Sequence, residues 1–144
     1  MAASGLRAVA RGVTSADDRA GWALASSVAT DGLWYWDVRR RAVRVTPRTE
    51  ELLGYAADEL GRRPADLLAR VDAGDQKRLR RALRPLLIGR RTGLEIELRV
   101  LTRGGQRRWC VLRARARRDA DGRARLIGGS IVDIDARKDR KSVV

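Results

Sequence analysis

The sequence of 144 residues contains no histidine and only one cysteine, Cys110. The missing histidine removes the commonest general base, the commonest zinc ligand and the usual proximal ligand of haem iron. A single cysteine excludes a disulfide within the chain and a C-x-x-C metal site. The sequence also has no glycine-rich phosphate loop and no serine or cysteine placed beside a base. These absences predict a protein that is not an enzyme.

Long apolar runs are absent as well. No run approaches the ~20 residues that a helix needs to cross a bilayer. Residues 1–13 are small and mildly basic and lack the sustained apolar middle of a signal peptide. We therefore predict no membrane insertion and a cytoplasmic location. The length suits one domain with a single hydrophobic core.

The formal net charge is +14, and nearly all of the positive charge is arginine. Clustered basic residues often bind nucleic acid. Here the arginines are dispersed along the chain, without the interleaved aromatic residues that stack on bases. We favour solvated arginine faces and do not expect nucleic acid as a partner. The alternative is an arginine-rich protein that binds nucleic acid or another polyanion, and retention on heparin that falls steeply with salt would identify it.

Hydrophobic periodicity predicts an α+β domain. The predicted elements are a helix at 15–30, strands at 33–38 and 42–46, short helical pieces at 49–55, 57–60 and 64–71, a longer helix from 74, and strands at 94–100, 110–117 and 124–132. One sheet covered on one face by the central helices is the economical packing for this order.

Four short phrases follow one another along the chain. They are D-G-L-W-Y-W-D at 31–37, V-T-P-R-T-E-E-L-L-G-Y at 45–55, V-D-A-G-D at 71–75 and D-I-D-A-R-K at 133–138. In this order they resemble the PAS sensor domain, in the subtype that ends in a PAC-type hairpin. The resemblance covers residues 31–138, and four phrases in register make a chance similarity improbable.

The resemblance implies a five-stranded antiparallel sheet that wraps a central pocket, with short helices on one face and an amphipathic cap helix before it. Residues 1–14 show no periodicity and are predicted to be a flexible N-terminus. With the resemblance, the chain then divides into the cap helix at 15–30, the PAS domain at 31–136 and the start of a C-terminal signalling linker at 137–144. The resemblance also implies a non-catalytic sensor or dimerisation module of a bacterial signalling protein. Such a module relays its state through flanking helices to an output domain, of the histidine kinase or cyclic-di-GMP enzyme type, beyond Val144 or on a separate protein.

Two departures from the family pattern bear on cofactors. Pro64 stands where the flavin photosensor subtype has the cysteine that bonds to flavin, and Ile131 stands where that subtype has a glutamine. We therefore predict no flavin–cysteine photochemistry and, without histidine, no histidine-ligated haem. Cys110 fits better as a small buried apolar residue than as an iron ligand. No cofactor is predicted, and an unknown small ligand stays open.

Strand alternation places Trp34 and Trp36 on one face, which by resemblance points into the pocket. The side chains expected around that space are Trp34, Trp36, Leu53, Leu67, Leu68, Leu83, Ile96, Leu98, Ile127 and Ile131. They form either the walls of a ligand site or the core itself. Because two indoles fill much apolar volume, we favour the filled core.

The opposite face of the first strand carries Leu33 and Tyr35, and the preceding helix carries an apolar stripe of Trp22, Leu24 and Val28. The helix either folds back on its own sheet or crosses to a second copy, and we predict a homodimer on this ground. By resemblance, the signal leaves through the residues of the last phrase, Asp133, Ile134, Asp135, Arg137 and Lys138.

Overall fold

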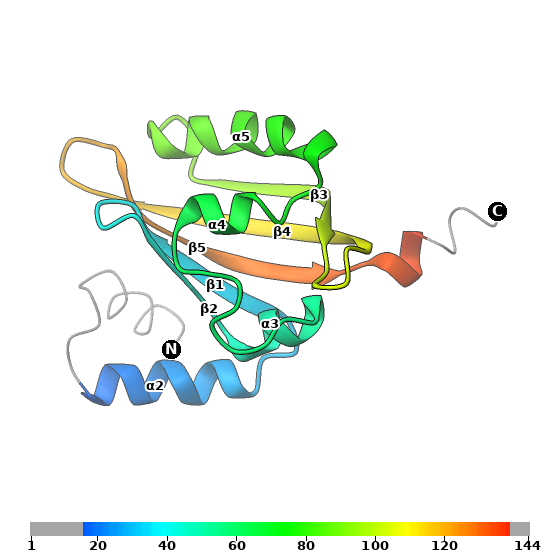
Figure 1. Cartoon of the computed structure of the whole chain (residues 1–144). Coiled ribbons are helices and arrows are strands. Elements are labelled where there is room, and N and C mark those ends of the chain that lie inside the picture. The colour runs from blue at the N-terminus through cyan, green and yellow to red at the C-terminus, as the bar shows by residue number, and fades with distance from the viewer. Residues whose placement is uncertain (1–15, 139–144) are drawn as a thin grey trace. The chain divides into compact units, whose positions relative to one another are not determined.

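The structure is a computed structural model that describes residues 16–138. The predicted flexible N-terminus at 1–14 and most of the predicted linker lie outside these residues. The chain divides into two compact units, 1–30 and 31–144. The described part of the first unit contains helix α2 (Ala16–Ser27), which lies within the helix predicted at 15–30 (Figure 1).

The second unit contains one antiparallel sheet of five strands in the order β2-β1-β5-β4-β3. The strands are β1 (Gly32–Asp37), β2 (Ala42–Val45), β3 (Gly93–Leu101), β4 (Arg107–Arg118) and β5 (Ala124–Asp133). The first and last strands of the unit are neighbours, with Trp34 opposite Gly129 and Trp36 opposite Ile127. This arrangement confirms the predicted α+β fold class with its five-stranded antiparallel sheet.

Three helices follow β2 along the chain, namely α3 (Pro47–Leu53), α4 (Pro64–Leu68) and α5 (Ala73–Leu87). Each of the two short helices begins with a proline, whose missing N–H has no partner to lose in the first turn. Helix α3 ends at Gly54, which adopts a left-handed φ of 78°. Helices α4 and α5 lie over the same face of the sheet (Figure 1).

The helical predictions differ from the structure in several bounds. Helix α3 covers 47–53 where 49–55 was predicted, and α4 ends at Leu68 where the prediction reached Val71, which instead pairs with Val100 in an isolated bridge.

Residues 57–60 form a turn and not a helical piece, because Asp58 has a φ of 62°, which a right-handed helix excludes. The Asp58 N–H donates instead to Glu50 Oε2 at 2.7 Å. Helix α5 begins earlier than predicted, because the Asp72 carboxylate accepts a hydrogen bond from the N–H of Gly74 at 3.3 Å and caps the helix.

The β3–β4 hairpin places the apolar rows of both strands on one face. Ile96 lies opposite Leu112 and Leu98 lies opposite Cys110. The turn between the strands uses Gly105 at a φ of 82°, the left-handed position that closes a three-residue hairpin loop. The inner face of the sheet therefore presents a continuous apolar surface to the helices.

Two clusters of buried side chains form the core. The larger cluster contains Leu53, Tyr55, Leu60, Val71, Leu79, Ile96, Leu98, Val100, Cys110 and Ile131. The smaller contains Leu86, Ala114, Ala124 and Ile127. Within residues 16–138, no helix is long and apolar enough to span a membrane.

Cys110 lies in the larger cluster and is only 1% exposed. Burial raises the pKa of its thiol to about 12. A thiol needs to be deprotonated and accessible to react, so we expect iodoacetamide to modify native Cys110 at least ~100-fold more slowly than the guanidinium-unfolded chain at pH 8. Mass spectrometry of a time course measures both rates. Rapid modification of the native protein would contradict the core position of Cys110.

Candidate functional site

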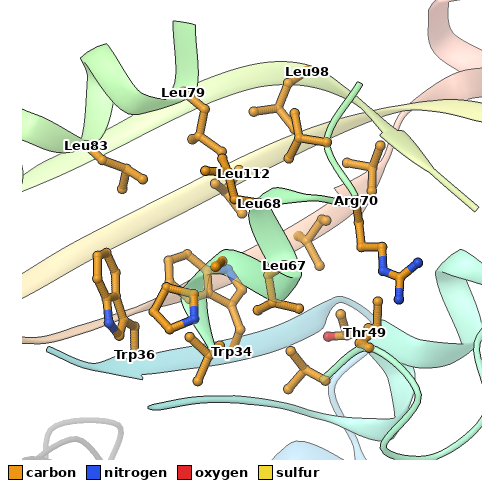
Figure 2. A pocket seen from close by; sticks show the side chains of 18 of the residues that line it. Trp34, Trp36, Thr49, Leu67, Leu68, Arg70, Leu79, Leu83, Leu98 and Leu112 are labelled. Atoms are coloured by element: carbon orange, nitrogen blue, oxygen red, sulfur yellow. The ribbon is translucent and has the colours of Figure 1, made fainter. Parts of the chain in front are cut away.

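A cavity of about 510 Å³ lies between the inner face of the sheet and the helices of the second unit (Figure 2). Its size is within the range of ~300–1,000 Å³ that small-molecule sites occupy. The lining residues are Trp34, Trp36, Val43, Val45, Thr49, Leu53, Leu60, Pro64, Ala65, Leu67, Leu68, Arg70, Val71, Leu79, Arg80, Leu83, Arg84, Leu87, Leu98, Val100, Leu112 and Ile131. We favoured a filled core here, and the structure instead leaves space beside the two indoles.

The structure brings most of the predicted pocket residues together. Those that line the cavity are Trp34, Trp36, Leu53, Leu67, Leu68, Leu83, Leu98 and Ile131. Ile96 and Ile127 are not among the lining residues. Ile96 packs in the larger core cluster, and Ile127 is fully buried in the smaller cluster with Leu86.

The two tryptophans stand next to each other on the inner face of β1. Their cross-strand partners on β2 are Val45 for Trp34 and Val43 for Trp36, and both valines also line the cavity. The Nε1 atoms of both indoles are buried and have no hydrogen-bond partner among the described residues. Both are unsatisfied donors that lie inside the wall, without accessible surface toward the cavity.

Arg70 is a lining residue that the sequence analysis did not single out. Its guanidinium lies over the ring of Tyr55, 5.0 Å from the ring centroid. Tyr55 is held in turn, because its hydroxyl donates to the carbonyl of Leu101 at 2.9 Å. The Leu101 N–H donates to the Arg70 carbonyl at 2.7 Å. The backbone of Arg70 is thus held by Leu101 of β3, and its guanidinium is held by Tyr55.

Trp109 on β4 joins the end of the domain to the sheet. The N–H of Ile134 donates to the Trp109 carbonyl, and the N–H of Trp109 donates to Asp135 Oδ1, both at 2.9 Å. Asp133 Oδ1 accepts from the N–H of Asp135 at 2.9 Å. Residues 135–138 form a helical turn. The predicted exit residues thus begin at the end of β5, and among them Arg137 is exposed.

The side chain of Lys138 in this turn contacts residues of the sheet. Its Nζ lies 4.5 Å from the centroid of the Trp109 ring and 2.7 Å from Glu97 Oε1 on β3. The Arg99 guanidinium lies over the same indole at 5.4 Å. Trp109 is therefore in contact with one cation from β3 and one from the exit turn.

Asp75 in the first turn of α5 connects this helix to β3. Its carboxylate accepts from the backbone N–H of Arg99 at 2.8 Å, from Arg99 Nε at 3.0 Å and from Arg78 at 3.3 Å. The hydrogen bonds from Arg99 hold the pKa of this buried carboxyl well below its usual range. The neighbouring Asp72 pairs with Arg99 at 3.5 Å and with Arg107 at 2.9 Å. A helix that lines the cavity is thus fixed to the strand whose Arg99 contacts Trp109.

The residues predicted for the cap and dimer interface are divided between the two units. Trp22 and Leu24 lie on α2 and Val28 follows its end, whereas Leu33 and Tyr35 lie on β1. Leu24 and Val28 are 71% and 78% exposed. Among residues 16–138, no group of three or more cysteine or carboxylate side chains is arranged to hold a metal ion.

Comparisons with known proteins agree with this geometry. A family model described as PAS fold matches residues 42–131. No curated protein matches the sequence. A sensory box histidine kinase/response regulator structure from Burkholderia thailandensis E264 is 30% identical, with a TM-score of 0.70 over 85% of this chain and 90% of that chain.

Two further structures show the same fold at lower identity. The N-terminal domain of a diguanylate cyclase with PAS/PAC sensor from Marinobacter aquaeolei is 22% identical, with a TM-score of 0.67 over 75% of this chain and 98% of that chain. The LOV domain of a blue-light activated histidine kinase from Erythrobacter litoralis EL346 is 21% identical, with a TM-score of 0.57 over 74% and 98% of the two chains. Sequence phrases, sheet order and family model agree, and the chain belongs to the PAS-fold family.

Proposed function

We propose that the chain is a non-catalytic, cytoplasmic sensor module that binds a small ligand in its cavity and relays the ligand state through its C-terminal turn. One observation carries the proposal. Ile131 lines the cavity, and Asp133, the first exit residue, follows it on the same strand. A ligand that moves β5 at Ile131 therefore acts within two residues of the exit.

The hydrogen bonds at the exit support a relay. Ile134 and Lys138 use their N–H groups to bind the carbonyls of Trp109 and Ile134 at 2.9 and 3.0 Å. A second route runs from the cavity through α5 to Asp75, Arg99 and Trp109. Both routes end on the turn at 135–138, which is where a following segment would receive the signal.

The output that we propose is a histidine kinase or a cyclic-di-GMP enzyme, in the same chain or on a partner protein. The similar structures from Burkholderia thailandensis and Marinobacter aquaeolei are named for a histidine kinase and a diguanylate cyclase. We also propose a homodimer, because the apolar stripe of α2 carries the exposed Leu24 and the adjacent Val28. Exposed apolar side chains of this kind gain stability when they pack against a second copy.

The proposed ligand is not a flavin bonded to cysteine. Pro64 and Ile131 both line the cavity, and neither side chain supplies the thiol or the amide that such photochemistry uses. The only thiol, Cys110, is buried in the core. A polyanion-binding role is less favoured, since several arginines already pair with carboxylates, among them Arg113 with Glu95 and Arg107 with Asp72.

Native mass spectrometry of the freshly purified chain tests ligand binding and dimerisation together. We expect a dimer mass with a small molecule bound to each copy. Size-exclusion chromatography with light scattering, repeated after removal of residues 1–30, then tests whether the first unit supports the dimer. An empty monomer at high micromolar concentration would overturn both parts of the proposal.

Hydrogen exchange tests the relay. We expect that removal of the bound molecule, by unfolding in guanidinium and refolding, accelerates exchange of the amides of Ile134 and Lys138 by about tenfold, because local opening of the turn becomes easier. The amide of Gly122, in the turn that precedes β5, is the matched control and should not change. If removal of the ligand changes the exchange rate of none of the three amides, a relay through this turn is refuted.

A further inference from the structure

The accessible surface of the cavity is almost entirely apolar. The polar atoms of its wall are turned elsewhere. The Nε1 atoms of Trp34 and Trp36 lie inside the wall without accessible surface, so the two indoles present carbon to the cavity. The hydroxyl of Thr49 donates to the carbonyl of Leu33 at 3.1 Å and is therefore already used. A ligand in this cavity meets carbon on nearly every side.

The charged residues of the wall hold their charges away from the cavity. Among the described residues, those that line it with a formal charge are Arg70, Arg80 and Arg84. Arg80 and Arg84 are exposed on α5. Because the cavity surface is apolar, these two side chains contribute methylene groups to it and extend their guanidinium groups to solvent. The guanidinium of Arg70 lies over the Tyr55 ring and points away from the tryptophans (Figure 2).

Neither water nor an ion suits such a cavity. A buried water molecule needs about two to four polar partners, and this wall offers almost none. An ion that entered would lose its hydration and find no partner in return, which is strongly unfavourable. An apolar molecule gains free energy instead, because its own surface and the surface of the wall both leave water. The chemistry of the wall therefore favours an occupant without charge.

We propose that the ligand is an uncharged apolar molecule, held by van der Waals contact and without an ion pair to the protein. This inference rests on the proposed ligand-sensing function of the cavity and names the chemical class of that ligand. Trp34 and Trp36 of β1 would contact it from the sheet, and Leu68 of α4 and Leu83 of α5 would contact it from the helices (Figure 2). Such a molecule fills the space between the sheet and both helices.

The test uses the full chain after bound molecules have been removed by unfolding in guanidinium and refolding. N-phenyl-1-naphthylamine, an uncharged probe whose fluorescence rises in apolar surroundings, reports occupation of the cavity. Naphthalene, 2-naphthoate and 2-naphthylmethylammonium then compete with this probe, and they share one ring system but differ in charge. We expect naphthalene to bind at least about tenfold more tightly than either ion, because a buried charge without a partner is unfavourable.

A variant with a filled cavity shows where these molecules bind. We expect Leu68→Trp to weaken the binding of naphthalene by about tenfold or more, because the larger side chain occupies the space that the ligand needs. Leu24→Trp is the matched control, because Leu24 is 71% exposed on α2 and does not line the cavity, and it should leave the affinity unchanged. If Leu68→Trp fails to fold, the comparison of the three competitors on the unsubstituted chain decides the question alone.

Three outcomes would overturn the inference. They are binding of 2-naphthoate as tight as that of naphthalene, equally tight binding of 2-naphthylmethylammonium, and an affinity for naphthalene that is unchanged in Leu68→Trp. In the first two the chain still takes a small molecule, so the sensor proposal stands and only the uncharged class of ligand fails. The third would place the binding site outside the cavity. Absence of binding by every probe also overturns the inference, whereas an empty monomer in the native mass spectrum is what overturns the sensor proposal.

Discussion

Gly129→Ala should lower the free energy of unfolding by about 3 kcal/mol or more, because the added methyl group has no space. Gly129 lies in β5 between Trp34 of β1 and Ala114 of β4. A Cβ atom there would overlap the carbonyl oxygen of Arg113 and lie 3.0 Å from the Cα of Ala114. Both obstacles are backbone atoms of a paired central strand, so neither can move aside without breaking the ladder.

Thermal and urea unfolding of the purified variants measure this loss. For a unit of this size a loss of that magnitude lowers the melting temperature by roughly 10 °C or more. Gly104→Ala is the matched control, because a Cβ at Gly104 meets only the Thr102 hydroxyl, at 3.9 Å, and it should change stability by less than about 1 kcal/mol. A Gly129→Ala protein as stable as the control would show that β4 and β5 are not packed as described.

The strands could be predicted well from the sequence, because alternation within a strand is a local signal. The alternation of Leu94, Ile96, Leu98 and Val100 identifies β3 directly, since successive strand residues face opposite sides. Packing explains why position 32, in the D-G-L-W-Y-W-D phrase, is a glycine. A Cβ at Gly32 would lie 2.5 Å from Thr49 Oγ1, so a side chain there would push α3 away from β1.

The cavity could not be predicted in the same way. Periodicity indicates which face of a strand is apolar, but the space that remains depends on how far α4 and α5 stand from the sheet and on the rotamers of Trp34 and Trp36. The position of Arg70 in the cavity wall could not be predicted for another reason. The chain has 32 lysine and arginine residues, and Arg70 differs from the solvated ones by its place in the cavity wall and its contact with Tyr55.

The ion pairs at the start of α5 could not be predicted from the sequence either. Asp75 is part of the V-D-A-G-D phrase, yet its partner Arg99 is 24 residues further along the chain. Only the docking of α5 on β3 brings the two together. Asp72, the other carboxylate of this phrase, reaches both Arg99 and Arg107 through the same docking.

Asp75→Asn should lower the free energy of unfolding at pH 7 by about 2 kcal/mol. The substitution keeps an acceptor for the Arg99 N–H but removes the negative charge that pairs with the Arg99 and Arg78 guanidinium groups. The Asp75 side chain is 6% exposed, so solvent screens this interaction much less than it screens a surface pair. Glu51→Gln is the matched control, since Glu51 pairs with Arg48 on an exposed face, and it should cost less than about 1 kcal/mol.

The pH dependence of this loss separates a charge effect from a simple packing effect. Hydrogen bonds from Arg99 place the pKa of Asp75 in the folded state below its value of 3.8 in the unfolded chain. The carboxylate therefore stabilises the fold fully above the unfolded pKa, and this contribution is lost as the pH falls below it towards the folded pKa. Urea unfolding at pH 7, 5, 4 and 3 should accordingly give a difference between the unsubstituted chain and Asp75→Asn that is constant down to pH 5 and shrinks below pH 4. A difference that is the same at pH 3 as at pH 7 would mean that Asp75 acts through shape, and the link from α5 to Arg99 and Trp109 would then not depend on charge.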